Sequence, residues 1–435
     1  MKVWIGFACL LGLVWLVRLL AMWLVYRRRQ VLGADAAVEL NGQVPKLSII
    51  VAAKDEEGDI EACVRGLLAQ DYPDFEVIAV NDRSEDRTPA ILDSLEAEYG
   101  GRLRVIHVTS LRDGWFGKNN AMREGIDAAR GDWFCMTDAD CKFHSPRTMS
   151  IAVSHALERG TDFLSIAPVV TTECWWERVL QPVCGAVLIV WFLPERVNNP
   201  KYRTAYANGA FMLMNRHCYD SIGGHAAFKT QVNEDIHMAR AAKASGLRLR
   251  VVENDGLYST RMYASLRQAI RGWSRIFYGS LATTRRLAAA TLIVLISSLF
   301  PWIGLLVSAW AWSGAETDIG WSTATYVWGV TCGLQVCVMA LFYPILRIPP
   351  AWALTYPIGS LGVIGILIRS ILQSLGAATT TWRGTTYRGD RLAGSSSATV
   401  VTQASAPKHG SIGRTGPAVS ETVVGSSAEN SSARA

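Results

Sequence analysis

Residues 131–140 read GDWFCMTDAD, so a short apolar run ends in two carboxylates one residue apart. At the carboxyl end of a strand in an α/β sheet, where ligands collect, such a pair can hold a hard divalent cation. Mg²⁺ in proteins usually binds through one or two carboxylates together with substrate phosphates. Asp138 and Asp140 therefore indicate a substrate that carries phosphate, and a nucleotide-sugar is one candidate. The alternative is an ordinary loop pair, because acidic residues are common in turns.

A rhythm of strands and helices surrounds this stretch. Short apolar runs, several rich in β-branched residues, predict buried strands at 47–52, 75–80, 103–108 and 133–137. Apolar residues at helical spacing predict helices at 59–70 and 119–130. Another helix is expected to start near Ser84, Asp86 and Pro89. Strands separated by helices predict an α/β fold with a mostly parallel sheet and helices on both faces.

Polar residues directly follow three of the four predicted strands. Lys-Asp-Glu follows the first strand at 54–56, Asn81 and Asp82 follow the second, and the Asp138 pair follows the fourth. Because the carboxyl ends of parallel strands meet at one edge of a sheet, we expect these side chains to gather in one crevice.

The N-terminus has the composition of a membrane anchor. The chain is 50% hydrophobic and only 18% charged, which is richer in apolar residues than a typical soluble domain. Val3–Tyr26 is interrupted only by Arg18 and is followed by three arginines. About 20 apolar residues can span a bilayer, and a basic flank marks the cytoplasmic side. Residues 1–29 are therefore interpreted as an uncleaved transmembrane anchor.

Three further apolar stretches lie at 288–312, 324–346 and 351–368, and we interpret 288–376 as a C-terminal transmembrane region. Arg285 and Arg286 before the first stretch predict a cytoplasmic flank, and Glu316 with Asp318 suits an outer loop. Three spans would place the C-terminus outside. The arginines that follow favour the inside, with one stretch re-entrant or interfacial; they are Arg369, Arg383, Arg388 and Arg391. Both topologies stay open.

The remaining segments have simpler interpretations. Residues 32–285, roughly 250 residues, are enough for one large α/β domain. Residues 395–435 are rich in Ser, Thr, Ala and Gly and are expected to be disordered. The net charge of +6 is modest and gives no indication of nucleic-acid binding. The nine cysteines show no Cys-x-x-Cys pair, which excludes a zinc ribbon and fits free thiols in a reducing cytoplasm.

Over residues 47–281 the chain resembles the family 2 glycosyltransferases, which have the GT-A fold with a Rossmann-like nucleotide-binding half. Four motifs carry the resemblance through their order and spacing: Ser48–Glu57, Val80–Thr88, Thr137–Asp140 and Asn233–Ile236. The resemblance implies an inverting transfer from a nucleotide-sugar with Mg²⁺ or Mn²⁺ as cofactor.

On the donor side, the resemblance implies a metal on Asp138 and Asp140, with Asp140 as the more direct ligand. Asp82 would accept hydrogen bonds from the base or ribose, although it could equally form a turn. Glu56 would line the nucleotide pocket, or else be a solvated residue at a helix start. Lys118 lies between a glycine and a helix start, where it would face the diphosphate or stay solvated.

On the acceptor side, inversion needs a base that deprotonates the acceptor hydroxyl. Asp235 is that candidate, and the adjacent Glu234 would raise its pKa by repulsion; the alternative is an acidic pair that interacts with a helix dipole. Asn208 resembles the acceptor-side segment, or marks a simple turn. Arg271 and Trp273 resemble a Gln-x-x-Arg-Trp motif with one inserted glycine, a departure that speaks against polymer synthesis. They would contact phosphate and sugar, or lie at the membrane interface.

The expected acceptor is a lipid. The segment at 175–193, which contains two tryptophans and an apolar run, is interpreted as an interfacial helix, with a buried core helix as the alternative. The arrangement resembles glycosyltransferases of hopanoid, carotenoid-acid and ceramide-type glycolipid pathways, as does the segment Thr381–Arg388. We therefore expect transfer from a UDP-hexose to a lipid at the cytoplasmic face of the cell membrane. The alternatives are a polysaccharide synthase and a non-catalytic scaffold. The sequence indicates no protein partner.

Overall fold

The computed structural model describes residues 1–40, 44–314, 318–377, 380–382, 385–388 and 391–392. The tail at 395–435 and Glu316 of the predicted outer loop lie outside these ranges. The late segment Thr381–Arg388 is described in part, as the backbone of short strands: β12, Thr380–Trp382; β13, Thr385–Arg388; and β14, Arg391–Leu392.

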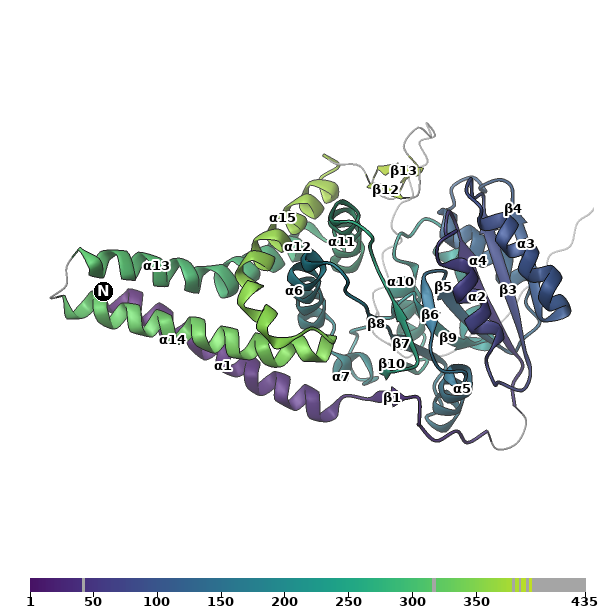
Figure 1. The fold of residues 1–435 in the computed structure, drawn as a ribbon, viewed down its shortest axis with the longest axis horizontal. Coiled ribbons are helices and arrows are strands. Elements are labelled where there is room, and N and C mark those ends of the chain that lie inside the picture. The colour runs from purple at the N-terminus through teal and green to yellow at the C-terminus, as the bar shows by residue number, and fades with distance from the viewer. Residues whose placement is uncertain (41–43, 315–317, 378–379, 383–384, 389–390, 393–435) are drawn as a thin grey trace, which may run out of the picture. The chain divides into compact units, whose positions relative to one another are not determined.

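Within the described residues, eight strands form one central sheet (Figure 1). In spatial order they are β1, Val31–Gly33; β10, Leu249–Asp255; β7, Phe163–Ala167; β9, Phe211–Asn215; β5, Trp133–Asp138; β2, Leu47–Ala53; β3, Phe75–Asp82; and β4, Leu103–Val108. Neighbouring strands are parallel, except that β9 runs antiparallel to both β5 and β7. The four predicted strands are β2 to β5, which lie side by side, so the prediction of a mostly parallel sheet is confirmed.

The side chains of β2 alternate between two hydrophobic cores, as the two-residue period of a strand requires. Ile49 and Val51 belong to the core that contains helix α2, Ile60–Leu68. Ile50 belongs to the core that contains α4, Gly117–Ala128. The α4 helix comes so close to the sheet that a Cβ on Gly125 would lie 2.6 Å from Cγ2 of Ile50. Helices thus cover both faces and leave the carboxyl ends of the strands open.

After the Asp138 pair the chain enters a second, three-stranded sheet. Its middle strand β11, Tyr258–Thr260, pairs antiparallel with β6, Cys141–Phe143, and parallel with β8, Val169–Val170. The other helices of this region are α3, Thr88–Tyr99; η1, Gly100–Arg102; α5, Thr148–Glu158; α7, Pro194–Val197; α8, Arg216–Ser221; α9, Gly224–Ala227; and α10, Glu234–Ala244. The acidic pair therefore lies where the large and small sheets meet.

Five helical segments of the described chain are long and apolar enough to cross a membrane. They are α1, Lys2–Arg28; α6, Trp175–Trp191, with α7; α12, Thr284–Val294, which continues through the π-helical turn η2, Leu295–Leu299, into α13, Phe300–Ser313; α14, Ile319–Phe342, with η3, Tyr343–Leu346; and η4, Pro350–Thr355, with α15, Tyr356–Ser374. All four apolar stretches expected to be membrane segments are thus helical.

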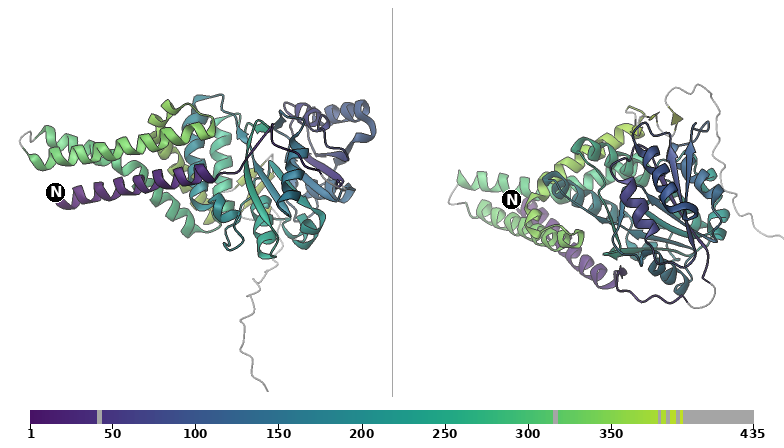
Figure 2. Two further views of the ribbon diagram at one scale, coloured as in Figure 1. Left: turned by 90° about the horizontal axis from the view of Figure 1, so that it is seen from below. Right: turned by 45° about the vertical axis from the view of Figure 1, so that its right-hand side comes forward.

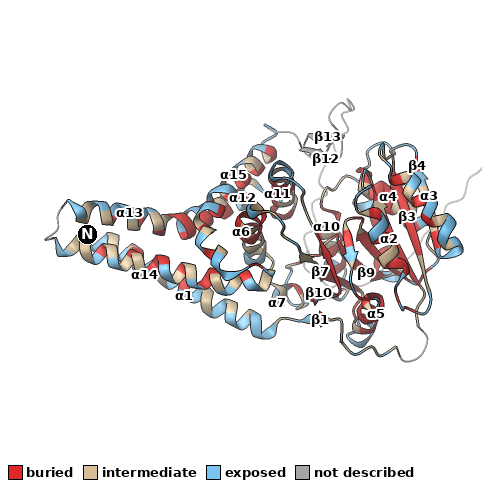
Figure 3. Cartoon of the chain, in the orientation of Figure 1, coloured by how far each residue is buried: buried red, intermediate tan, exposed pale blue. Residues whose placement is uncertain are grey.

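The apolar helices fall into two groups. The first group, α1, α13 and α14, lies side by side and extends away from the sheets, whereas α6, α12, α15 and the more polar α11, Leu266–Leu281, lie next to the sheets (Figures 1 and 2). The outer surface of the first group is largely exposed, while the sheet strands are buried (Figure 3).

Candidate active site

A single cavity of about 1650 Å³ opens at the carboxyl ends of β2, β3 and β5. All of the predicted site residues line it, although they come from loops and helices far apart in the sequence. They are Glu56, Asp82, Lys118, Asp138, Asp140, Asn208, Glu234, Asp235, Arg271 and Trp273. Six of the residues that follow the predicted strands line this cavity, namely Lys54, Asp55, Glu56, Asp82, Asp138 and Asp140, whereas Asn81 is buried outside it.

Lys118 joins the two acidic motifs. It lies in the first turn of α4, and its Nζ is 2.7 Å from Oδ1 of Asp138 and 2.9 Å from Oε1 of Glu234. Burial lowers the pKa of this lysine, but the two carboxylates outweigh that effect and leave the pKa above its ordinary value. A half-buried cation thus links the donor-side motif to the motif that carries Asp235, a pairing that the sequence does not reveal.

Asp138 and Asp140 form a donor set that suits a hard cation. Both line the cavity, and the side chain of Asp138 is 36% exposed. The described residues contain no group of three or more His, Cys, Asp and Glu side chains placed to hold a metal. The two carboxylates of Asp138 and Asp140 fit Mg²⁺ or Mn²⁺, which binds through one or two carboxylates together with the phosphates of a bound substrate.

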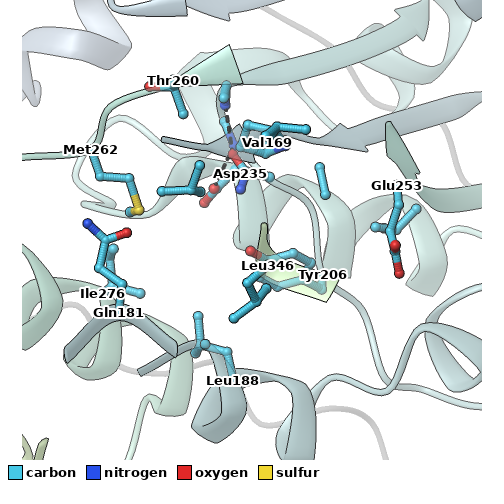
Figure 4. A pocket seen from close by; sticks show the side chains of 18 of the residues that line it. Val169, Gln181, Leu188, Tyr206, Asp235, Glu253, Thr260, Met262, Ile276 and Leu346 are labelled. Carbon is cyan, nitrogen blue, oxygen red and sulfur yellow. Dashed lines mark hydrogen bonds between the residues drawn. The ribbon is translucent and has the colours of Figure 1, made fainter. Parts of the chain in front are cut away.

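Asp235 is the second residue of α10 and lies at the cavity wall (Figure 4). Its Oδ2 accepts a hydrogen bond from the backbone N–H of Gly209 at 3.0 Å, and Oδ1 accepts one from Ile236 at 2.7 Å. Burial raises the pKa of Asp235 to about 7, and the adjacent Glu234 adds to the rise, whereas Lys118 opposes it. A carboxyl group with a pKa near neutrality is suited to accept a proton.

The loop at Asn208 positions this carboxylate. The side-chain oxygen of Asn208 accepts a hydrogen bond from the N–H of Ala210, which turns the chain so that Gly209 faces Asp235. A Cβ at Gly209 would lie 3.1 Å from Nζ of Lys118, so glycine leaves room for both groups. Asn208 therefore forms a turn, the simpler of its two expected roles, and this turn also builds the site.

The nucleotide-side residues have internal partners. Asp82 is buried, and its two oxygens accept hydrogen bonds from Arg83 at 2.7 and 2.9 Å. The backbone N–H of Glu56 donates to Thr88. The sequence argument did not single out Arg83, although it lies inside the quoted motif; its φ of 55° is unusual for a residue other than glycine.

Trp273 and Arg271 occupy different environments on α11. Trp273 is 5% exposed and packs beside Phe277 in the core of the helical layer, so most of its ring is structural. Arg271 is exposed and borders the cavity. The glycine between them has a local cause, because a Cβ on Gly272 would lie 2.3 Å from the ring of Tyr263.

Comparison with known proteins covers part of this site, because Glu234, Asp235, Arg271 and Trp273 lie beyond the matched residues. Residues 48–223 match the model of glycosyl transferase family 2. This part of the chain is therefore similar to family 2 glycosyltransferase domains. The structure of a mannosyltransferase from Pyrobaculum calidifontis aligns with 86% of this chain and 99% of its own length at 18% identity and a TM-score of 0.52, a similarity that shows the GT-A fold of the chain.

Two curated relatives of this chain illustrate the extent of the similarity. A beta-monoglucosyldiacylglycerol synthase of Trichormus variabilis is 30% identical over 189 residues, which are 43% of this chain and 39% of the relative. A 4,4'-diaponeurosporenoate glycosyltransferase of Staphylococcus haemolyticus is 24% identical over 295 residues, which are 67% of this chain and 76% of the relative. The alignment thus spans about two fifths of the first relative and about three quarters of the second.

Proposed function

We propose that this glycosyltransferase transfers a hexose from a nucleotide-sugar to the hydroxyl group of a membrane lipid, with inversion and with Mg²⁺ or Mn²⁺ as cofactor. One observation carries the proposal: the cavity that contains the acidic residues continues to apolar side chains of the membrane helices. These include Leu19 and Met22 of α1, Leu188 and Ile189 of α6, and Leu341 and Ile345 of α14 and η3.

The two ends of the cavity suit two substrates of opposite polarity. Asp235 lies on one side of the cavity and Leu188 on the other, and Tyr206 and Leu346 lie next to each other (Figure 4). Burying a lipid chain against apolar side chains is favourable by about 25 cal/mol per Å². A lipid can therefore present its hydroxyl to Asp235 while its chains remain against the membrane helices.

The acidic pair and Lys118 would bind the donor. Asp138 and Asp140 would hold the metal, which when bound neutralises the diphosphate and acts as a Lewis acid for its departure. Lys118 would keep one positive charge close to Asp138 and the leaving phosphate. Asp82 and Glu56 line the same part of the cavity and would contact the nucleoside.

Asp235 would act as the base. Its two backbone hydrogen bonds, from Gly209 and Ile236, fix the plane of the carboxylate. A carboxylate oxygen would take the proton of the acceptor hydroxyl while that oxygen attacks the sugar from the face opposite the leaving group. Inversion at the anomeric carbon follows from this single displacement.

The names of the relatives support both substrates. The synthase of Trichormus is named for a glucosylated diacylglycerol, the transferase of Staphylococcus is named for a carotenoid acid, and the mannosyltransferase structure contains GDP-Man and Mn²⁺. These names favour a lipid acceptor over a growing polysaccharide. We propose UDP-hexose as donor and place the domain on the cytoplasmic side of the cell membrane, next to the arginines that end α1.

The decisive experiment uses the full chain in vesicles made from lipids of its host, with labelled UDP-glucose and other nucleotide-hexoses. Mass spectrometry of the organic extract should show a lipid that carries one hexose. Asp235→Asn should reduce its formation between about a hundredfold and ten-thousandfold. Asp127→Asn, at an exposed ion pair on α4, is the matched control and should leave the rate unchanged. A polymeric product would identify a polysaccharide synthase, and no product with any donor would favour the scaffold.

A further inference from the structure

The two groups of apolar helices differ in what holds them together, and this difference bears on the membrane topology independently of the proposed function. The first group forms a bundle. Nε1 of Trp4 on α1 donates to Oγ of Ser308 on α13 at 2.8 Å, and Trp328 of α14 packs against Gly304 of α13. Oγ1 of Thr331 on α14 donates to the backbone of Ala8 at 3.2 Å. Direct contacts among α1, α13 and α14 therefore hold the bundle together.

Helix α15 packs elsewhere. Near its start, the hydroxyl of Tyr356 hydrogen bonds to Ser298 in the π-helical turn at 2.8 Å. Near its end, Ser374 hydrogen bonds to Thr284, the first residue of α12, at 2.9 Å. Ser370 donates to the backbone of Ser274 on α11 at 3.0 Å. Helix α15 thus runs back from the π-helical turn along α12, toward the sheets, instead of along α13 into the bundle.

An ion pair and a hydrogen bond attach the helices next to α15 to the glycosyltransferase domain. Glu177 of α6 is fully buried and pairs with Arg261, which follows β11. Asn233, before α10, donates to the backbone of Ile276 on α11 at 3.2 Å. Helix α11 also carries Arg267, Arg271 and Arg275. Charged side chains are costly in the hydrocarbon core, so a helix with three arginines belongs outside it. Because α15 packs against α11, its C-terminal half belongs outside the core as well.

The turn η2 marks the boundary of the hydrocarbon. Five-residue η2 and fourteen-residue α13 together extend about 28 Å at 1.5 Å per residue, close to the roughly 30 Å of a bilayer core. At this level Nε1 of Trp15 donates to the backbone of Ser297, and the guanidinium of Arg18 lies 4.6 Å from the centre of the Trp15 ring. Tryptophan, tyrosine and arginine are typical of the interface between membrane and water. A position of Arg18 at this interface explains why the apolar anchor contains an arginine.

The outer face of α15 is apolar along its length, with Ile358, Leu361, Ile368 and Leu372 between 45% and 63% exposed. Helices α11, α12 and α15 also carry arginines: Arg267, Arg285, Arg286 and Arg369. An exposed apolar face on helices that carry arginines is typical of the head-group region of a leaflet with anionic lipids.

We propose that only α1, α13 with η2, and α14 cross the bilayer, and that α6, α11, α12 and α15 form a layer in the interface of the leaflet that faces the domain. Two of the five apolar segments are then interfacial. Of the three crossings, α1 precedes the domain, and α13 and α14 follow it. These last two crossings return the chain to the side of the domain, so the end of α15 lies on that side. This agrees with Arg369 and the later arginines and resolves the two topologies left open by the sequence.

Labelling with a membrane-impermeant maleimide tests the sidedness. Cysteines are introduced one at a time at exposed positions in the full chain after the accessible Cys9, Cys174 and Cys337 are replaced by serine. The new cysteines are Glu61→Cys in the domain, Ser313→Cys at the end of α13, and Leu375→Cys after α15. We expect Leu375→Cys to be labelled from the same side as Glu61→Cys, and Ser313→Cys from the other side. Labelling of Leu375→Cys together with Ser313→Cys would overturn the proposal.

A depth measurement tests the layer itself and does not depend on sidedness. A spin label at Leu361→Cys on α15 is compared with one at Val330→Cys on α14, which is 71% exposed within the bundle. We expect Leu361→Cys to lie about 5–10 Å below the head groups, and Val330→Cys to lie near the bilayer centre. Equal, central depths for both labels would show that α15 crosses the membrane.

Discussion

At the scale of single residues, Lys118 has the most consequential position, since it is half-buried and lies between Asp138 and Glu234. Removing its charge would leave the nearly buried Glu234 without its partner. We predict that Lys118→Met destabilises the fold by about 3 kcal/mol or more and abolishes transfer. Thermal unfolding in detergent measures the first effect. Lys201→Met, at an exposed site, is the control, and equal melting temperatures for the two variants would refute the structural role of Lys118.

The pKa of Asp235 sets the pH dependence of transfer. Since burial and Glu234 raise this pKa to about 7, the carboxylate form is lost as the pH falls through 7. We predict that kcat/KM falls about tenfold per pH unit below this value and levels off above it. Glu234→Gln removes the repelling charge and should shift the profile toward acid pH. A profile that does not move in this variant would show that Asp235 does not control it.

At the scale of elements, the packing of α11 depends on a glycine. A Cβ at Gly272 would lie 2.3 Å from the Tyr263 ring, whereas nothing lies within 4 Å of a Cβ at Gly185 on α6. We predict that Gly272→Ala costs about 1–3 kcal/mol through overpacking, while Gly185→Ala is neutral or stabilising. Melting temperatures compare the two variants. In a Tyr263→Ala background, Gly272→Ala should no longer lower the melting temperature, and a remaining cost would point to another cause.

The sequence predicts elements whose signal is local. Strands β2 to β5 were predicted because their apolar runs are continuous and the helices between them have clear spacing. The three-residue β1 was not predicted, because its pairing with β10 joins segments more than 200 residues apart. The acidic site residues follow strand ends and helix starts, so they could be found. The link through Lys118 could not, since it depends on the position of α10 against α4. Length and hydropathy could not separate α15 from a span, because only its packing partners differ.

At the scale of the whole molecule, the proposed donor site would need a cation. We predict that EDTA lowers transfer by about a hundredfold or more, because several kcal/mol of charge stabilisation correspond to about tenfold per 1.4 kcal/mol. Excess Mn²⁺ or Mg²⁺ should restore the rate. Asp140→Asn should raise the metal concentration needed for half-maximal activity, while Asp127→Asn should not. Full activity in EDTA would refute the metal role.

The cavity that joins the acidic residues to α1, α6 and α14 has a kinetic consequence. The proposed donor is dissolved in water and the proposed acceptor lies in the bilayer. The donor concentration is therefore given per volume, and the acceptor concentration is given per amount of lipid. The rate should follow the mole fraction of the acceptor among the lipids, and adding inert lipid at constant total acceptor should slow the reaction. Adding more vesicles of the same composition, with the enzyme held at a fixed amount and already fully bound, should change little. Such surface dilution is the signature of an enzyme that searches for its acceptor in two dimensions.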